Sequence, residues 1–264
     1  MSHTQRRSTA RRRVLLAFSI VALAPAAAFA GQTRCWIDKG ALVASAAFGD
    51  IAGDFLIDLS SPVSQLHNTR AELAGLEAPV IRRDLTIGGK RVAGVDMAVA
   101  DLDARTRAFD TSISGVIGAD VLGRYTVDIE TSPCRIRLSS VQTRRFRGGV
   151  RLSVKLVDGR PLVGAKISDG VRVRTGLFAI DTGRWATGVA DARLSRTPDA
   201  DPDQPPVPTR LRALELGGKL FEQAPAFIDS GGDGEPTGSI GMAVWSSWHL
   251  RLDMQYGWLD LEAR

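Results

Sequence analysis

The sequence predicts an all-β protein built from two related halves. Residues 150–157 alternate between apolar and polar side chains, as a half-buried strand does, and the pairs Asp158-Gly159 and Asp169-Gly170 are strong hairpin signals. Helical patterns are few, and the longest, residues 69–76, suffices for about two turns. The chain also repeats itself along its length. We therefore expect two β barrels or sandwiches with short helices.

Two aspartates in matching apolar frames anchor the repeat. Asp58 follows the tripeptide Phe-Leu-Ile, and Asp181 follows Phe-Ala-Ile 123 residues later. The glycine segments 115–118 and 238–241, which both end in Ile-Gly, have the same separation. These equal offsets indicate a duplication in which each copy brings one aspartate to a shared place. A purely structural β protein with no such duplication would need them to arise by chance.

Repeat and composition together divide the chain into parts. The two copies are expected to form lobes over residues 31–143 and 150–264. Residues 144–149, rich in arginine and glycine, are the expected linker. Within the second lobe, residues 197–208 are dense in proline and aspartate and predict a flexible surface loop.

Residues 1–30 have the order of a secretory signal. Five arginines precede the apolar run 14–23, and Ala28-Phe29-Ala30 fits a cleavage site. The run is short for a membrane span, which favours cleavage over an uncleaved anchor. Arg11-Arg12-Arg13 also loosely fits a twin-arginine signal, so both the Sec and the twin-arginine routes stay open. We expect a periplasmic or secreted protein.

Charge and cysteine content narrow the function further. The chain has 34 Lys and Arg against 29 Asp and Glu, and the five arginines of the signal account for the excess, so nothing predicts nucleic-acid binding. Cys35 and Cys134 most simply form one disulfide after export, with two buried thiols as the alternative. Only His67 and His249 follow the signal, and there is no Cys-x-x-Cys pair, so no metal or other cofactor is expected.

These ordered landmarks resemble the retropepsin and pepsin class of aspartic peptidases. In that class an aspartate after an apolar strand is followed by Thr-Gly, as in Asp181-Thr182-Gly183, and later by an apolar-apolar-Gly segment. The duplication is similar to the two-lobed members, and residues 61–76 resemble small bacterial retropepsin-like proteins. The resemblance covers about residues 36–261 and implies two pseudo-symmetric β-barrel lobes.

The resemblance implies a role for each residue of the motif. Asp58 and Asp181 would share one proton and activate a water toward a peptide bond, because two carboxylates about 3 Å apart cannot both ionise. The Thr182 hydroxyl would lock the two aspartate loops together, and Gly183 would let the backbone pass close to the aspartates.

Further glycines and one arginine complete the expected site. Gly118 and Gly241 would pack against the aspartate loops, with simple turn glycines as the blander interpretation. The hairpins at Gly88-Gly89 and Gly217-Gly218 would occupy the position of the family's flaps. Arg184, next to the second motif, faces either the cleft or solvent.

The first motif departs from the family pattern. Leu59 stands where threonine or serine is expected and cannot donate the locking hydrogen bond, and Ser60 adds a side chain where glycine is expected. Ser60 is also close enough in sequence to hydrogen-bond Asp58 and alter the shared proton. The first motif of this two-lobed, exported chain is therefore degenerate.

The sequence favours an exported aspartic-type endopeptidase, acting as a monomer on polypeptides without a cofactor. The alternative is a catalytically impaired pepsin-like module that binds a peptide or envelope partner in the groove between the lobes. Leu59 and Ser60 favour this alternative, and the retained pair of aspartates favours the enzyme. Contact with a membrane is expected only through an uncleaved signal.

Overall fold

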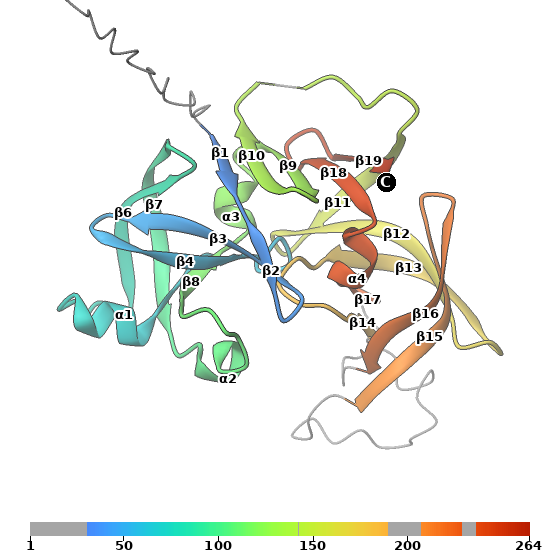
Figure 1. The fold of residues 1–264 in the computed structure, drawn as a ribbon, viewed down its shortest axis with the longest axis horizontal. Helices are drawn as coiled ribbons and strands as arrows, with labels where there is room; N and C mark the ends of the chain where they lie inside the picture. Colours follow the sequence, from blue (N-terminus) through green and yellow to red (C-terminus); the bar gives the residue numbers. More distant parts are fainter. Residues whose placement is uncertain (1–30, 142, 190–206, 229–235) are drawn as a thin grey trace, which may run out of the picture.

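The computed structural model describes residues 31–141, 143–189, 207–228 and 236–264 (Figure 1). Strands hold 59% of the described residues and helices 9%, and the strands close into two six-stranded barrels, so the predicted all-β fold is confirmed. The signal at 1–30 lies outside the described residues, as does the predicted surface loop 197–208 except for its last two positions. None of the helices in the described part of the chain is long and apolar enough to cross a membrane.

Lobe one comprises the described residues of 31–143 and contains ten strands and three short helices. The strand over residues 80–87 largely alternates in burial, with Ile81, Leu85 and Ile87 inside, whereas the strand over residues 113–117 is buried throughout. The strands are β1 (Gln32–Arg34), β2 (Trp36–Asp38), β3 (Ala41–Phe48), β4 (Ile51–Ile57), β5 (Gln65–His67), β6 (Val80–Ile87), β7 (Lys90–Ala100), β8 (Ile113–Ile117), β9 (Thr126–Thr131) and β10 (Cys134–Ser139). The helices are α1 (Asn68–Leu73), α2 (Asp103–Thr106) and α3 (Ala119–Leu122).

Lobe two comprises the described residues of 150–264 and repeats the order of elements that surrounds the aspartate in lobe one. Short helix α4 (Met242–Trp245) follows β17 (Gly238–Ile240) as α3 follows β8, and a closing hairpin comes after each helix. The elements are β11 (Val150–Val157), β12 (Arg160–Ser168), β13 (Val173–Ile180), β14 (Thr187–Val189), β15 (Val207–Leu216), β16 (Lys219–Ile228), β17 (Gly238–Ile240), α4 (Met242–Trp245), β18 (Trp248–Asp253) and β19 (Trp258–Ala263). The linker expected at 144–149 lies in the connection between β10 and β11.

Strand pairing places the two aspartates at equivalent points. In lobe one β4 runs parallel to β8, with Ile57 opposite Ile117, and in lobe two β13 runs parallel to β17, with Ile180 opposite Ile240. Extra pairings, β3 with β6 and β12 with β15, close the sheets into barrels. Each aspartate therefore leaves the carboxyl end of a buried strand beside a glycine segment.

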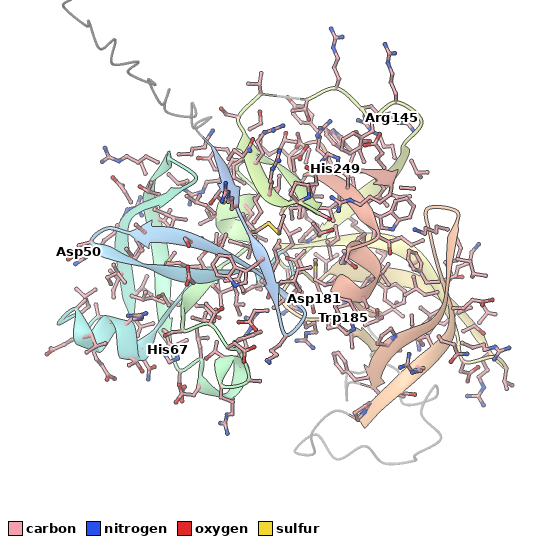
Figure 2. The ribbon with its side chains drawn as sticks, in the orientation of Figure 1. Asp50, His67, Arg145, Asp181, Trp185 and His249 are labelled. Atoms are coloured by element: carbon pink, nitrogen blue, oxygen red, sulfur yellow. A yellow bond between two sulfur atoms is a disulfide. The ribbon has the colours of Figure 1, made fainter. Side chains whose placement is uncertain are left out.

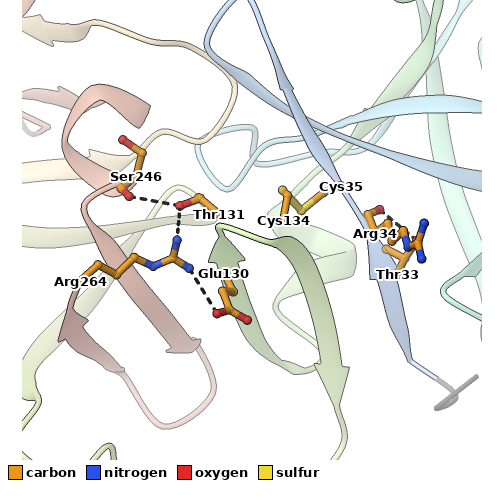
Figure 3. The surroundings of a disulfide bond; sticks show 8 residues. All are labelled: Thr33, Arg34, Cys35, Glu130, Thr131, Cys134, Ser246 and Arg264. Carbon is orange, nitrogen blue, oxygen red and sulfur yellow. Dashed lines mark hydrogen bonds and ion pairs between the residues drawn. A yellow bond between two sulfur atoms is a disulfide. The ribbon is translucent and has the colours of Figure 1, made fainter.

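Six strands join the lobes in one continuous part of the larger sheet, in the order β1-β10-β9-β18-β19-β11. Three come from each lobe, and the junction is the antiparallel pair of β9 and β18 (Figure 1). Across it the buried Thr126 hydroxyl donates to the Asp253 carboxylate at 2.8 Å. The C-terminal Arg264 also reaches Thr131 of β9 at 2.9 Å (Figure 3).

A disulfide between Cys35 and Cys134 confirms the predicted pairing (Figure 3). The two residues are 99 positions apart, and their Cα atoms lie 5.0 Å from each other. Cys35 stands between β1, which belongs to the larger sheet, and β2, which belongs to the barrel sheet of lobe one. The bond therefore ties the first barrel to the sheet that joins the lobes.

Candidate active site

Asp58 and Asp181 line one cavity of about 810 Å³. Each residue is 2% exposed, and each backbone N–H donates to the neighbouring parallel strand at 3.0 Å, to Ile117 for Asp58 and to Ile240 for Asp181. Figure 2 shows Asp181 near the middle of the molecule, where the lobes meet. The duplication thus brings the two predicted aspartates to the same place.

One hydroxyl connects the two aspartate loops. Thr182 Oγ1 accepts a hydrogen bond from the backbone N–H of Leu59 at 3.1 Å and donates to the backbone carbonyl of Ile57 at 2.6 Å. The Thr182 carbonyl also accepts from the Leu42 N–H at 2.8 Å. The side chain of Leu59, fully buried, has no hydroxyl to return the interaction. The connection between the loops is therefore one-sided.

Asp58 has donors on both carboxylate oxygens. Its Oδ1 accepts from the backbone N–H of Ser60 at 2.8 Å and from the Ser60 hydroxyl at 2.7 Å. Its Oδ2 forms an ion pair with Arg105, which extends from α2. Ser60 therefore adds a donor to the aspartate that a glycine at that position would not supply.

Asp181 has a different balance of neighbours. Its Oδ1 accepts from the Gly183 N–H at 3.0 Å, its Oδ2 pairs with Arg184 Nε at 2.8 Å, and the Ser239 side chain also hydrogen-bonds to it. Burial, followed by the nearby charge of Asp58, raises the pKa of Asp181 to about 7, and these three partners only partly oppose the shift. Below neutrality Asp181 therefore carries a proton.

Gly183 is a point of close approach between the two aspartate loops. A Cβ built at this position would lie 2.7 Å from Asp58 Oδ2 and equally close to Arg105 Nη2. Any side chain would displace the ion pair between them. Glycine at this position lets the backbone of lobe two approach the carboxylate of lobe one.

The glycines at the ends of β8 and β17 pack against the same loops. A Cβ at Gly118 would lie 2.7 Å from the Ser61 carbonyl oxygen, and one at Gly241 would lie 2.4 Å from that of Trp185. Ser61 and Trp185 follow their aspartates by three and four residues. Both contacts are with backbone atoms, which cannot move aside as a flexible side chain could.

The expectation that two glycine pairs form flaps is wrong, because neither hairpin tip lines the cavity. The Gly88 carbonyl accepts from the Gly31 N–H at 2.8 Å, so the Gly88-Gly89 tip lies against the residue that precedes β1. A Cβ at Gly217 would contact Val150 and Leu261. Because β6 pairs with β3, the first hairpin forms part of the barrel of lobe one. The pairing of β15 with β12 has the same effect in lobe two.

Charged residues that the sequence left unassigned also shape the site. Arg105 lies in a short charged stretch in which two aspartates, 101 and 103, precede two arginines, 105 and 107, and nothing in the sequence marks it as a partner of Asp58. Arg184 lines the cavity and is half-exposed, so it faces the cleft. His67 is buried at the start of α1 and faces Asp103 of α2 at 3.2 Å. It therefore helps to hold the helix that carries Arg105.

The architecture is the pepsin-like fold, two β barrels joined by a shared sheet with their aspartates beside one cavity. The aspartic proteinase from Irpex lacteus has this fold. The structural match covers 88% of this chain and 97% of the proteinase chain, with a TM-score of 0.53 and 10% sequence identity. No family model matches this sequence, and no curated protein matches it significantly. At this identity the similarity establishes the fold alone.

Proposed function

We propose that this protein is an exported aspartic-type endopeptidase that hydrolyses peptide bonds with Asp58, Asp181 and a water molecule. The observation that carries the proposal is the unequal pair of buried carboxylates at one cavity. Asp58 is ion-paired with Arg105, whereas burial and the charge of Asp58 raise the pKa of Asp181 to about 7. A carboxylate beside a carboxylic acid is the combination that this chemistry requires.

In the proposed reaction the ion-paired Asp58 is the base and Asp181 is the acid. Asp58 takes a proton from the water as the water oxygen bonds to the peptide carbonyl carbon, and Asp181 gives its proton to the carbonyl oxygen. The C–N bond then breaks as the nitrogen takes the proton from Asp58. One hydroxyl of the tetrahedral intermediate returns a proton to Asp181, which restores the starting state.

Two further observations support the proposal. A cavity of about 810 Å³ lies within the usual range for ligand pockets, and the fold neighbour is an aspartic proteinase. The disulfide between Cys35 and Cys134 is compatible with a periplasmic or secreted protein. We propose that residues 1–30 direct export and that a monomer acts on polypeptide.

A second candidate function is a peptide-binding module without catalysis. The observation that favours it is an arginine on each aspartate, Arg105 on Asp58 and Arg184 on Asp181 at 2.8 Å. These guanidinium groups compete with a water or a substrate for the carboxylate oxygens. The one-sided loop connection through Thr182 points the same way.

Cleavage of unfolded casein and of a peptide library by the exported protein, between pH 4 and 8, tests the first proposal. Asp58→Asn and Asp181→Asn should each abolish cleavage, and wild-type activity should fall as the pH rises through about 7, where Asp181 loses its proton. Asp96→Asn, a change at an exposed ion pair on β7, serves as the control. Cleavage that survives in either asparagine variant contradicts the enzyme, and binding of peptides without cleavage supports the second candidate.

A further inference from the structure

Positive charge dominates the cavity beyond the two aspartates. Among the described residues that line it, four side chains are cationic and two are carboxylates. Three of the four cations have a carboxylate partner within the chain: Arg105 with Asp58, Arg184 with Asp181 at 2.8 Å, and Lys39 with Asp110 at 2.8 Å. The remaining cation is Arg160.

Arg160 lacks a partner among the described residues. It takes part in none of their ion pairs, and its buried Nε has no hydrogen-bond acceptor. A guanidinium N–H that is removed from water without an acceptor is unfavourable, so a buried donor of this kind normally faces a group that will accept its hydrogen bond. The Nε atom is itself shielded from water, but the Arg160 side chain also lines the cavity, where its charge, unpaired among the described residues, can attract an anionic group of a ligand.

The backbone fixes Arg160 beside the aspartate loop of the other lobe. It is the first residue of β12 and follows the two-residue turn Asp158-Gly159, in which both φ angles are positive. A Cβ at Gly159 would lie 3.3 Å from the Pro62 Cβ, four residues after Asp58. The turn of lobe two therefore rests on lobe one next to the aspartate.

The corresponding turn of lobe one makes the reciprocal contact. Lys39 and Gly40 form it, and a Cβ at Gly40 would clash with Trp185, four residues after Asp181. The two turns thus bring one cation each, Lys39 and Arg160, to the shared cavity. Lys39 receives its carboxylate from Asp110, whereas Arg160 receives none from the described residues.

We propose that Arg160 is a specificity residue that binds a carboxylate of the peptide, so that the protein selects acidic peptides. A guanidinium presents paired N–H donors that match a carboxylate and remains charged at every working pH. The carboxylate belongs either to a glutamate or aspartate side chain near the scissile bond or to the C-terminus of the peptide. The proposal deepens the proposed function, since it names the substrate class of the same cavity.

Binding of non-cleavable peptides tests this proposal separately from catalysis. In each peptide a reduced amide replaces the scissile bond. The peptides come in pairs that differ at one position, which is Glu in the acidic member and Gln in the neutral member. A further pair differs only at the C-terminus, which is a free acid in one member and an amide in the other. Affinities for the exported protein are measured at pH 6, where a glutamate is ionised. We expect wild type to bind the acidic member of at least one pair about tenfold more tightly.

Arg160→Met keeps most of the side-chain volume but removes the charge. In this variant the affinities for the acidic and the neutral peptide of that pair should differ by no more than about twofold. The substitution should leave the affinity for the neutral member unchanged. Arg160→Lys, which keeps a point charge, should retain part of the preference. Arg137→Met on the exposed face of β10 is the matched control and should behave as wild type.

The outcomes separate the inference from the proposed function. Equal binding of acidic and neutral peptides by wild type, or an acidic preference that persists in Arg160→Met, overturns the inference even if the protein cleaves peptides. An Arg160-dependent preference without any cleavage supports the inference and contradicts the peptidase. A preference confined to the acid and amide pair identifies the C-terminal carboxylate as the group that is bound, and one confined to a Glu and Gln pair identifies a side chain.

Discussion

At the residue scale, the two aspartates have unequal hydrogen-bond partners. Asp58 receives two donors from Ser60 and one from Arg105, whereas Asp181 receives a single backbone donor from Gly183 together with its arginine and serine partners. Ser60, which stands where lobe two has Gly183, is thus part of the difference. Each aspartate has three donors in all, but only Asp58 receives a hydroxyl from its own loop.

The pKa of Asp181 predicts a specific pH dependence of stability. Its raised value, about 7 against an ordinary 3.8, means that between these values the folded state holds a proton that the unfolded state has lost. This contribution to the unfolding free energy is fully present below about pH 4 and disappears as the pH rises through about 7, with an upper limit of about 4 kcal/mol. Asp181→Asn should remove that part of the pH dependence.

Urea unfolding at pH 5 and pH 8 measures the difference. Between pH 5 and pH 8 the unfolding free energy of wild type should fall by more than that of Asp181→Asn. All other ionisable groups are present in both proteins, so their contributions cancel in the comparison. Parallel pH profiles for the two proteins would show that Asp181 is already ionised at pH 5.

At the element scale, a short helix supplies the least expected part of the site. Helix α2 carries Arg105 to Asp58, and its position depends on Asp103 facing the buried His67 and on Leu102, which is 4% exposed. His67 in turn caps α1 by accepting from the Thr69 N–H. Two small helices that follow different strands are therefore coupled through one histidine.

The elements that could be predicted from the sequence are those with local or repeated signals. Alternating residues identify strands, and equal offsets identify Asp58 and Asp181 whatever the details of the barrels. A Gly-Gly hairpin tip gives the same local signal wherever the hairpin points, so the long-range pairing of β6 with β3 decided where Gly88 lies. Arg105 could not be found because its contact with Asp58 spans 47 residues and has no counterpart in the repeat.

The one-sided connection between the aspartate loops predicts a gain of function. Leu59→Thr with Ser60→Gly supplies the missing hydroxyl and lets the backbone approach as Gly183 does in lobe two. If the loops are misplaced by about 1 Å, the restored connection should raise kcat by up to about a hundredfold. Because Leu59 is fully buried, the change should also lower the unfolding free energy by about 1–3 kcal/mol.

The matched control for this gain is Leu59→Val with Ser60→Gly, since valine has the shape of threonine without the hydroxyl. Single-turnover kinetics on one peptide compare kcat for the two double variants. Equal rates for the two would attribute any gain to the glycine or to the altered volume, and would contradict the role assigned to the hydroxyl.

At the scale of the whole molecule, the sheet that joins the lobes determines how the aspartates meet. Asp128 of β9 lies at its junction and pairs with Arg251 at 2.7 Å and His249 at 2.9 Å, both on β18. The side chains of Asp128 and Arg251 are each 13% exposed, so water screens this pair far less than it screens a surface pair. Removal of one partner should therefore disturb both the stability and the relative placement of the lobes.

The last prediction concerns Asp128→Asn. Burial works to raise the pKa of Asp128, but the hydrogen bonds and charges of His249 and Arg251 outweigh it and lower that pKa. The stabilisation is thus present above about pH 4 and lost as the pH falls further. Urea unfolding at pH 7 should show that Asp128→Asn has an unfolding free energy about 2–4 kcal/mol below that of wild type, and this difference should become smaller toward pH 3.

The control is Asp96→Asn, which breaks the exposed pair with Arg82 on the first barrel and should lower the unfolding free energy by less than about 1 kcal/mol. Peptide cleavage should fall in Asp128→Asn and not in Asp96→Asn, because only the former loosens the sheet that positions the two aspartate loops. Equal losses in the two variants would show that the junction is no more important than an ordinary surface ion pair.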